Sequence, residues 1–454
     1  MSISISSKHL QGKERQEIIE AVQQQAKAAA LQAIKPVLTG FLEAEVALKL
    51  GREKGATRQM SSQKREIDWT CGFCGCQDAH QFTRDGHYKR NLETGWGHVQ
   101  DMQVPMLECQ QCHHDVICQF SILEKYQRFW LDLDQDVLFS SGLGQSLRAI
   151  SQAWSAKLDG SVGLRTLNER INQIEPLVRQ MREQPITSVP AVVQLDGIWV
   201  TIQKQGEQSK PDKRKRSRKQ RTGQKMVILV ALGFWEDGTR EILDWQIAPS
   251  EEHTQWESLL NRLWKRGVQP ETGLKLVVRD GSGGLGEALA LVYGTSVLDQ
   301  RCIFHKLRNV ADKARSELKG QDKREQRKRL MEQAKAIYQA ESAAQATERL
   351  QLWATQWREC APKAVATLEK EFEHTLVYYA LDAITREWIR TTSLLERTNR
   401  ELRRKFRQAV SFGSQTGAEV AVYLQVQRLH ARWTGASWWQ VSHDLLFALW
   451  KADP

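Results

Sequence analysis

The chain has 454 residues, of which 41% are hydrophobic and 26% charged, values that are typical of globular proteins and exclude disordered or collagen-like chains. This length predicts two or more packed domains. The longest near-continuous apolar run, residues 226–235, is about half of what a helix needs to cross a bilayer, and the first residues lack an apolar signal region. We therefore expect a soluble, unexported, cytoplasmic protein with no membrane partner.

Positive charge is concentrated in three stretches of a chain whose net charge is +11. Residues 213–225 carry eight bases and no acid, residues 306–329 ten bases and four acids, and residues 386–407 eight bases and three acids. Together, these three stretches carry a larger net positive charge than the chain as a whole. A charge run is often only a solvated surface, but this concentration is also the electrostatic footprint expected for a polyphosphate partner such as DNA.

The first predicted element is a long helix. Residues 8–55 have apolar side chains at helical spacing, and the helix is expected to stop near Gly51 and Gly55. We assign residues 1–60 to an N-terminal helical arm. Over residues 61–125, glycines, cysteines and short strand-like runs replace the helix formers. This change of composition predicts a small separate module.

The module contains two C-x-x-C pairs, Cys71 with Cys74 and Cys109 with Cys112. Each pair places two thiolates on one tight turn, and two such turns complete a tetrahedral structural zinc site, so we expect a zinc-ribbon-like module rather than a disulfide framework. The 34 residues between the pairs require an inserted hairpin. Ordinary buried thiols are the alternative interpretation. Other nearby residues compete as ligands: Cys76, Cys118, His113 and His114.

Residues 126–185 are predicted to be helical and to form a helix-turn-helix-like DNA-binding segment. Two short helical segments join around Asp159 and Gly160, with Ser161 as the cap of the second helix. We expect its outward face to carry Arg165, Asn168 and Glu169. An ordinary helical hairpin fits the same pattern.

From about residue 186 the pattern becomes that of an α/β domain. Three strand-like runs, 191–202, 226–235 and 240–248, precede a helix that ends at Gly267, and the order then continues strand, helix, strand. The predicted order is β-β-β-α-β-α-β, with the last short strand near residues 296–298 and a long basic loop at 210–224. Residues 306–385 are almost wholly helical by pattern and form an insertion, after which residues 386–454 add the C-terminal helices.

Three carboxylates stand out in this part of the chain. Asp196 interrupts a hydrophobic strand, where a lone carboxylate costs several kcal/mol unless it is paired or bound to a metal. Asp280 closes the apolar strand that precedes the turn GSGG, and sites in α/β sheets gather at strand ends. Glu396 lies one position off the apolar stripe of the last predicted helix, on the same side as Asn399 and Arg403.

Two strand carboxylates and one helical carboxylate, surrounded by positive charge, suit a two-metal phosphoryl-transfer site. Hard oxygen ligands select Mg²⁺ or Mn²⁺, and a pair of such ions activates the attacking oxygen and stabilises the leaving one. Each residue alone has an ordinary explanation, because a strand-end Asp commonly forms a turn and a helical Glu among arginines commonly forms a surface ion pair.

Several motifs resemble the Mutator-like insertion-sequence transposases. The resemblance covers residues 249–308, with VVRDGSGGL and QRCIFHKLRN, and residues 391–414, TTSLLERTNRELRRKFRQAVSFGS; GHYKRNLETGWGHVQDMQVP near the N-terminus is also similar. It implies a ribonuclease-H-like fold with a DDE triad and a helical insertion between the second Asp and the Glu. The triad then falls on Asp196, Asp280 and Glu396.

The resemblance also places the family's C-x-x-H signature on Cys302 and His305, close to the active centre, although packing residues at the start of a helix would look the same. It implies a DDE-type transposase that cleaves transposon ends, joins them to target DNA and acts as at least a dimer. We expect basic residues to bind DNA phosphates: Lys213, Arg214, Lys215, Arg216, Arg218, Lys219, Arg221, Arg404 and Lys405. Two alternatives remain open, a catalytically inactive, transposase-derived zinc-ribbon DNA-binding protein and a structure-selective nuclease on the same scaffold.

Overall fold

The computed structural model describes residues 15–57, 64–123, 127, 131–158, 162–211, 217–381, 398, 400–403 and 412–452. The chain forms two compact units. The first comprises Met1–Ser141 and Leu147–Ile171, and the second Gly142–Ser146 and Asn172–Pro454. No helix in the described ranges combines the length and the apolar content that a membrane span requires.

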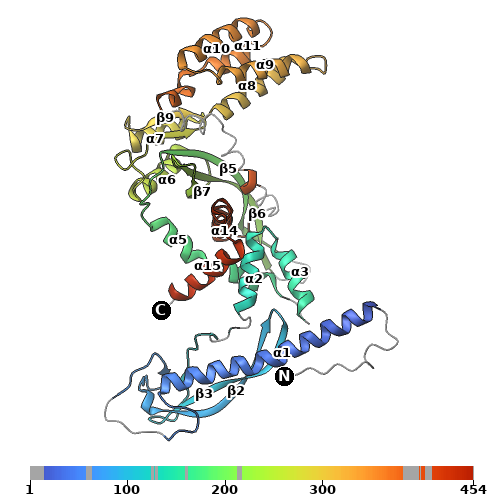
Figure 1. Ribbon diagram of the computed structural model, residues 1–454, viewed down its shortest axis with the longest axis vertical. Helices are drawn as coiled ribbons and strands as arrows, with labels where there is room; N and C mark the ends of the chain where they lie inside the picture. Colours follow the sequence, from blue (N-terminus) through green and yellow to red (C-terminus); the bar gives the residue numbers. More distant parts are fainter. Residues whose placement is uncertain are drawn as a thin grey trace. The chain divides into compact units, whose positions relative to one another are not determined.

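The first unit begins with the long helix α1 (Arg15–Leu50), drawn in blue in Figure 1. Its buried side chains recur every fourth residue at Leu38, Leu42, Val46 and Leu50, so one stripe of the helix joins a hydrophobic core. The helix ends before Gly51, whose φ of +66° is a conformation that favours glycine.

The rest of that core comes from a small β module. An antiparallel hairpin packs against α1, and a second, two-stranded pairing joins residues 70–71 to residues 116–117. Trp69 and Phe82 are fully buried, and the Trp69 indole donates a hydrogen bond to the Gln119 carbonyl at 3.0 Å. The module consists of β1 (Thr70–Cys71), η2 (Ala79–Gln81), β2 (Phe82–Thr94), β3 (Gly97–Cys109) and β4 (Val116–Ile117).

Short helices follow the module: α2 (Leu131–Gly142), α3 (Leu147–Lys157), α4 (Leu164–Asn172) and α5 (Glu175–Glu183). Two hydrogen bonds tie α3 to the start of the next helix, since Ser151 donates to the Val162 carbonyl at 2.6 Å and the Val162 N–H donates to Ser155 at 3.2 Å. In α4, Leu167 and Ile171 are buried. The predicted turn residues Asp159 and Gly160 and the predicted cap Ser161 lie outside the described residues.

The second unit is built on a five-stranded mixed sheet of order β7-β6-β5-β8-β9. The pairs β5–β6 and β6–β7 are antiparallel, whereas β5–β8 and β8–β9 are parallel. Helices α6 and α7 connect the last three strands, so the predicted order β-β-β-α-β-α-β is observed. The elements are β5 (Val192–Pro211), β6 (Ser217–Phe234), β7 (Arg240–Ala248), α6 (His253–Lys265), β8 (Leu276–Arg279), α7 (Gly283–Tyr293) and β9 (Leu298–Arg301).

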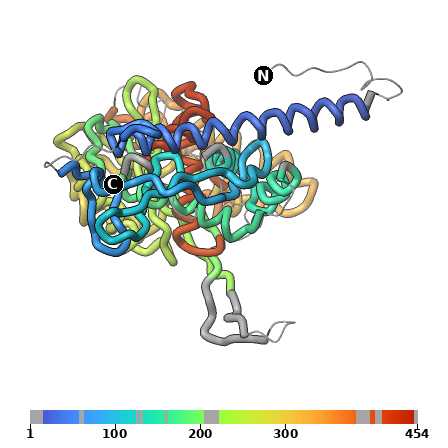
Figure 2. Tube along the Cα trace, turned by 90° about the horizontal axis from the view of Figure 1, so that it is seen from below, coloured from blue at the N-terminus to red at the C-terminus, as the bar shows by residue number. Residues whose placement is uncertain are grey.

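Two of these strands differ from the prediction. The last strand is Leu298–Arg301 rather than residues 296–298, and β6 begins at Ser217, inside the stretch that the sequence predicted to be a basic loop. Most of the outer parts of β5 and β6 pair only with each other, so these strands extend beyond the sheet as a two-stranded ribbon. The light-green inner end of this ribbon can be followed in Figure 2. Backbone pairing requires no apolar side chains, so composition gave no sign of this extension.

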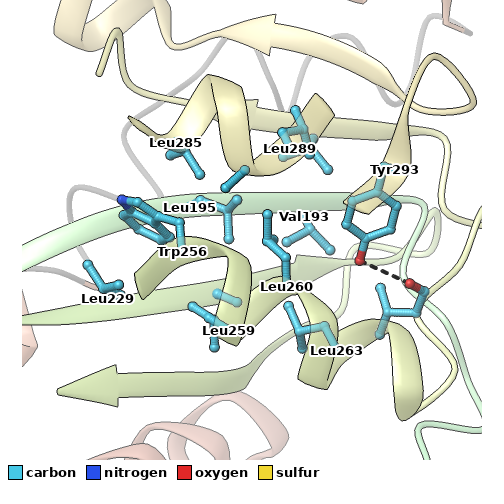
Figure 3. Packing of buried hydrophobic residues seen from close by; sticks show 14 of the residues in the cluster. Val193, Leu195, Leu229, Trp256, Leu259, Leu260, Leu263, Leu285, Leu289 and Tyr293 are labelled. Carbon is cyan, nitrogen blue, oxygen red and sulfur yellow. Dashed lines mark hydrogen bonds between the residues drawn. The ribbon is translucent and has the colours of Figure 1, made fainter. Parts of the chain in front are cut away.

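One face of the sheet packs against α6 and α7 (Figure 3). Val193, Leu195 and Leu229 from the strands meet Trp256 and Leu260 of α6, all of them at most 1% exposed. The opposite face carries α14 near β7, where the Trp245 indole donates to Glu419 at 2.7 Å. The sheet therefore lies between two helical layers.

The insertion after β9 is helical, as predicted. Its helices pack on one another (orange in Figure 1) and comprise α8 (Ile303–Glu317), α9 (Arg324–Ile337), α10 (Ala343–Trp357), α11 (Pro362–Glu369), η3 (Glu373–Thr375) and η4 (Val377–Ala380). The chain ends with α14 (Gln415–Thr434) and α15 (Trp438–Ala452). Of the predicted helix at residues 386–408, only residues 398 and 400–403 are described.

Candidate active site and cysteine cluster

Asp196 lies in β5, and Asp280 directly follows β8, the parallel strand beside it. Val192 pairs with Leu276 and Gln194 with Val278, so the same register brings Asp196 level with Asp280, the residue after β8. Level residues of parallel strands point to the same face of a sheet. Because the odd-numbered residues Val193 and Leu195 face α6 and α7, both aspartates lie on the opposite face.

The start of α8 reaches the same place. Arg279 pairs with Arg301 of β9, so the next residue, Cys302, is level with Asp280. Cys302 is 5% exposed, and its N–H donates to the Arg279 carbonyl at 2.6 Å. One turn into α8, His305 places Nε2 3.8 Å from Asp196 Oδ1. The two residues of the C-x-x-H signature thus lie beside the two aspartates.

Asp196 is a strongly desolvated carboxylate, only 8% exposed. Burial raises its pKa, the charges of His305 and Arg403 and the hydrogen bond from the Gly197 N–H lower it, and Asp280 raises it further; the net pKa is above the ordinary value. The Gly197 N–H donates to Oδ1 at 2.9 Å. A buried acid beside a second acid is destabilised as an anion, and a cation between the two would relieve this cost.

Asp280 is held by the turn that follows β8. Its Oδ1 accepts a hydrogen bond from the Ser282 N–H at 2.9 Å. Just before it, Arg279 makes a two-bond ion pair with Asp299, with both N–O distances 2.7 Å. A Cβ on Gly281 would lie 2.2 Å from the Arg301 guanidinium, so a larger residue here would displace the Arg301 side chain. These contacts fix the direction of the Asp280 carboxylate.

The third predicted acid lies outside the part of the chain that the structure describes. Glu396 and Asn399 lie outside the described residues, whereas Arg403 is described and is close enough to Asp196 to lower its pKa. The described residues bring together Asp196, Asp280, Cys302, His305 and Arg403. Two carboxylates on one face form a donor set that suits a hard divalent cation. The His305 Nδ1 atom is buried and has no hydrogen-bond partner among the described residues.

Sequence reasoning missed one acidic residue near the site. Glu251 lies between β7 and α6, is half-buried, and interacts electrostatically with both Asp280 and Asp196. Like Asp280, Glu251 follows a buried strand. This position is the one feature of the sequence that could have indicated Glu251 as a residue near the site. Nothing in the sequence indicated that the end of β7 comes close to β5 and β8 at the level of the two aspartates.

A second candidate site lies in the first unit. The Sγ atoms of Cys71, Cys74, Cys109 and Cys112 all lie within 4.8 Å of one another, and among the described residues they form the one group of this kind. Cys71 and Cys112 are 3.4 Å apart, and Cys74 and Cys109 are 3.7 Å apart. The β2–β3 hairpin supplies the inserted hairpin that the spacing of the pairs required.

The two cysteine turns have the same construction. In the first, the Gly75 N–H donates to the Cys71 carbonyl at 3.2 Å; in the second, the His113 N–H donates to the Cys109 carbonyl at 2.8 Å. Gly75 and His113 both have positive φ, +69° and +54°. Burial raises the pKa of Cys71, but hydrogen bonds from the backbone of Cys74 and Phe73, and from neighbouring thiols, lower it to about 6. This geometry matches a four-thiolate zinc site.

The competing ligands are engaged elsewhere. His113 Nδ1 lies 2.7 Å from Glu108, and His114 Nδ1 lies 2.7 Å from the Cys112 carbonyl. Burial raises the pKa of Cys118 to about 12, and its thiol donates to the Val116 carbonyl. Cys76 is half-buried and lies outside the cluster.

The predicted DNA-contacting residues are described only in part. In α4, Arg165, Asn168 and Glu169 are exposed, and Arg165 Nε lies 2.7 Å from Glu169. Arg218, Lys219 and Arg221 belong to β6. The remaining predicted residues lie outside the described ranges: Lys213, Arg214, Lys215, Arg216, Arg404 and Lys405.

The fold and the two sites define an α/β protein with an acidic centre on a mixed sheet and a separate four-cysteine module. A family model described as "Transposase, Mutator family" matches residues 14–436. The chain therefore belongs to the Mutator family of transposases, which confirms the resemblance found in the sequence.

Known proteins similar to the chain are also described as transposases. The transposase for insertion sequence element IS905 of Lactococcus lactis is 26% identical, over 77% of this chain and 82% of that protein. The transposase for insertion sequence element ISRM5 of Rhizobium meliloti is 25% identical, over 82% and 80%. Among solved structures, the Drosophila P element transposase strand transfer complex matches at a TM-score of 0.34 and 8% identity, over 65% of this chain and 92% of that one.

Proposed function

We propose that the chain is a DDE-type DNA transposase that cleaves transposon ends and joins them to target DNA, with Asp196, Asp280 and Glu396 as its triad. The observation that carries the proposal is the level placement of Asp196 and Asp280 on one face of the sheet, with His305 against Asp196. The mixed sheet with its helical insertion supports a ribonuclease-H-like core. Membership of the Mutator family supplies the class of reaction.

The three acids would hold two Mg²⁺ or Mn²⁺ ions. Such a pair supplies Lewis-acid activation of the attacking oxygen and stabilises the leaving one. The chain's own contribution is orientation: the Gly197 N–H fixes the Asp196 carboxylate, and the Ser282 N–H fixes that of Asp280. Arg403 contributes positive charge beside Asp196.

The reaction consists of two phosphoryl transfers. In the first, a water oxygen attacks the phosphorus at a transposon end, the bond to the 3′ oxygen breaks, and this oxygen takes up a proton to give a free 3′-hydroxyl. In the second, that hydroxyl loses its proton and attacks a target phosphodiester, whose own 3′ oxygen leaves and is protonated. The number of phosphodiester bonds is unchanged in the second step, so no external energy source is needed.

The other modules would bind and position DNA. We propose that the four-cysteine cluster holds a structural Zn²⁺ and that this module and helices α2–α4 read the transposon end. The basic stretches at residues 213–225, 306–329 and 386–407 would neutralise phosphates. Pairing two transposon ends needs at least two protomers, so we propose self-association.

A strand-transfer assay tests the proposal. The full chain, Mg²⁺, oligonucleotides with the element's native ends and a target plasmid should give nicked ends and joined products. Asp280→Asn should abolish both products and retain end binding, because the amide keeps the shape but loses the charge that holds the cation. The control is Asp237→Asn, which makes the same change in the turn between β6 and β7.

Strand transfer by Asp280→Asn at the wild-type rate would refute the assignment of the site. Salt-sensitive DNA binding by the wild-type chain without any nicking would favour the inactive DNA-binding protein. Nicking without joining, on substrates unrelated to the native ends, would favour a structure-selective nuclease.

A further inference from the structure

Glu251 is a third acidic residue that the described structure places at the two aspartates. It lies in the short connection between Ala248, the end of β7, and His253, the start of α6. An acid at this position commonly interacts with the N-terminus of the helix that follows. Here the side chain extends instead toward β5.

Two glycines make room for this connection, and each belongs to a segment that carries one of the aspartates. A Cβ on Gly197, the residue after Asp196, would lie 2.4 Å from Glu251 Oε1. A Cβ on Gly284, in the first turn of α7 after Asp280, would lie 3.0 Å from the Glu251 carbonyl oxygen. Any larger residue at either position would displace Glu251 or the backbone that it contacts.

The Glu251 carboxylate lies against the Gly197 backbone of β5, and Trp199 of the same strand lies close enough to lower its pKa. Burial raises the pKa of Glu251, and the charges of Asp280 and Asp196 raise it further, while the interaction with Trp199 lowers it. The Glu251 carboxylate therefore interacts electrostatically with both aspartates, although it lies on the face of the sheet to which a side chain at position 197 would point.

We propose that Glu251 is a positioning residue of the active site. This inference rests on the proposed DDE function. Its carboxylate packs on the Asp196–Gly197 backbone, so it helps to fix Asp196, and its negative charge strengthens the binding of a divalent cation by Asp196 and Asp280. Glu251 is not assigned as a ligand, because its carboxylate meets the sheet on the opposite side from the Asp196 carboxylate.

The test compares Glu251→Gln with Glu252→Gln. Glutamine retains the shape of the side chain and an acceptor oxygen but removes the charge, and Glu252 is the exposed neighbour whose side chain makes no capping bond. Mn²⁺ binding to the full chain, with the cysteine cluster first loaded with Zn²⁺, is measured by titration calorimetry. Asp280→Asn identifies which part of the isotherm belongs to the site.

We expect Glu251→Gln to weaken Mn²⁺ binding roughly three- to tenfold, because one unit charge is removed near a divalent ion in a partly buried site. The Mn²⁺ concentration for half-maximal cleavage should rise by the same factor, with unchanged affinity for end DNA, whereas Glu252→Gln should match wild type. Gly197→Ala, which fills the space of Glu251 Oε1, should shift Mn²⁺ binding in the same direction.

Wild-type Mn²⁺ affinity in Glu251→Gln would overturn the inference. Failure of the proposed function has a different signature, since Asp280→Asn would then cleave DNA as well as wild type. The calorimetric comparison does not depend on cleavage, so it tests Glu251 in either case.

Discussion

Replacing Asp196 by asparagine should stabilise the metal-free protein while abolishing strand transfer. Asp196 is 8% exposed, and burial is the largest of the influences that raise its pKa, so the charged form is costly in the folded state. Asparagine keeps an oxygen for the Gly197 N–H, which donates at 2.9 Å, and loses the attraction to His305 at 3.8 Å. Because the lost attraction offsets part of the gain, we expect a net stabilisation of about 1–2 kcal/mol.

The assay is chemical denaturation of both proteins with and without Mg²⁺. At a concentration ten times its dissociation constant, Mg²⁺ should stabilise wild type by about 1.4 kcal/mol and leave Asp196→Asn nearly unchanged. Asp237→Asn is the contrasting control, because hydrogen bonds from Thr239 lower the pKa of this exposed carboxyl and their weakening should destabilise the turn. An Asp196→Asn protein that is less stable than wild type without Mg²⁺, or that gains as much from Mg²⁺, would refute the reasoning.

Three further predictions concern stability. Cys71→Ser, or a strong zinc chelator, should remove bound zinc and unfold the β module, seen as zinc release and a lost thermal transition, whereas Cys360→Ser should change neither because Cys360 lies outside the cluster. Asp244→Asn should destabilise the second unit by about 3–5 kcal/mol in urea, because Asp244 is fully buried 2.7 Å from Arg262 and 3.4 Å from Arg266, whose charges would lose their partner. His430→Gln should remove part of the acid sensitivity of folding, because burial lowers the pKa of His430 to about 4.

The sign of the His430 effect follows from proton binding. The unfolded chain takes up this proton near pH 6.5, but the folded chain does so only near pH 4, so stability is full above about pH 6.5 and falls as the pH drops toward 4. The loss attributable to His430 is about 3 kcal/mol. Urea denaturation between pH 4 and pH 7 measures it, with the exposed His374→Gln as control.

Each of these predictions has a contradicting result. A β module that melts at the same temperature without zinc would show that its hydrophobic core is enough to keep it folded. An Asp244→Asn protein as stable as wild type would show that water satisfies the charges of Arg262 and Arg266. Equal pH dependence in His430→Gln and wild type would show that burial does not hold His430 neutral in the folded chain.

The sequence predicted the sheet and two of its acids for a clear physical reason. Strands buried on both faces appear as continuous apolar runs, so Asp196 and Asp280 stood out as polar residues inside or at the end of such runs. The two C-x-x-C pairs were equally visible, because the spacing of metal-binding thiols is local in the chain.

Other features depend on proximity in space and had no such signal. Glu251 comes near the aspartates only because β7 and α6 meet beside Gly197 and Gly284, which no local pattern records. The β5–β6 ribbon extends through charged residues that lack strand periodicity, so the sequence predicted a loop there. The position of Glu396 relative to the sheet stays a prediction.

The most direct test of the shared cation site is the anomalous scattering of Mn²⁺ in crystals of the chain bound to its transposon-end DNA. The account predicts manganese peaks between Asp196 and Asp280, with the Glu396 carboxylate within ligating distance. Manganese bound elsewhere, or a Glu396 side chain remote from both aspartates in that complex, would contradict it.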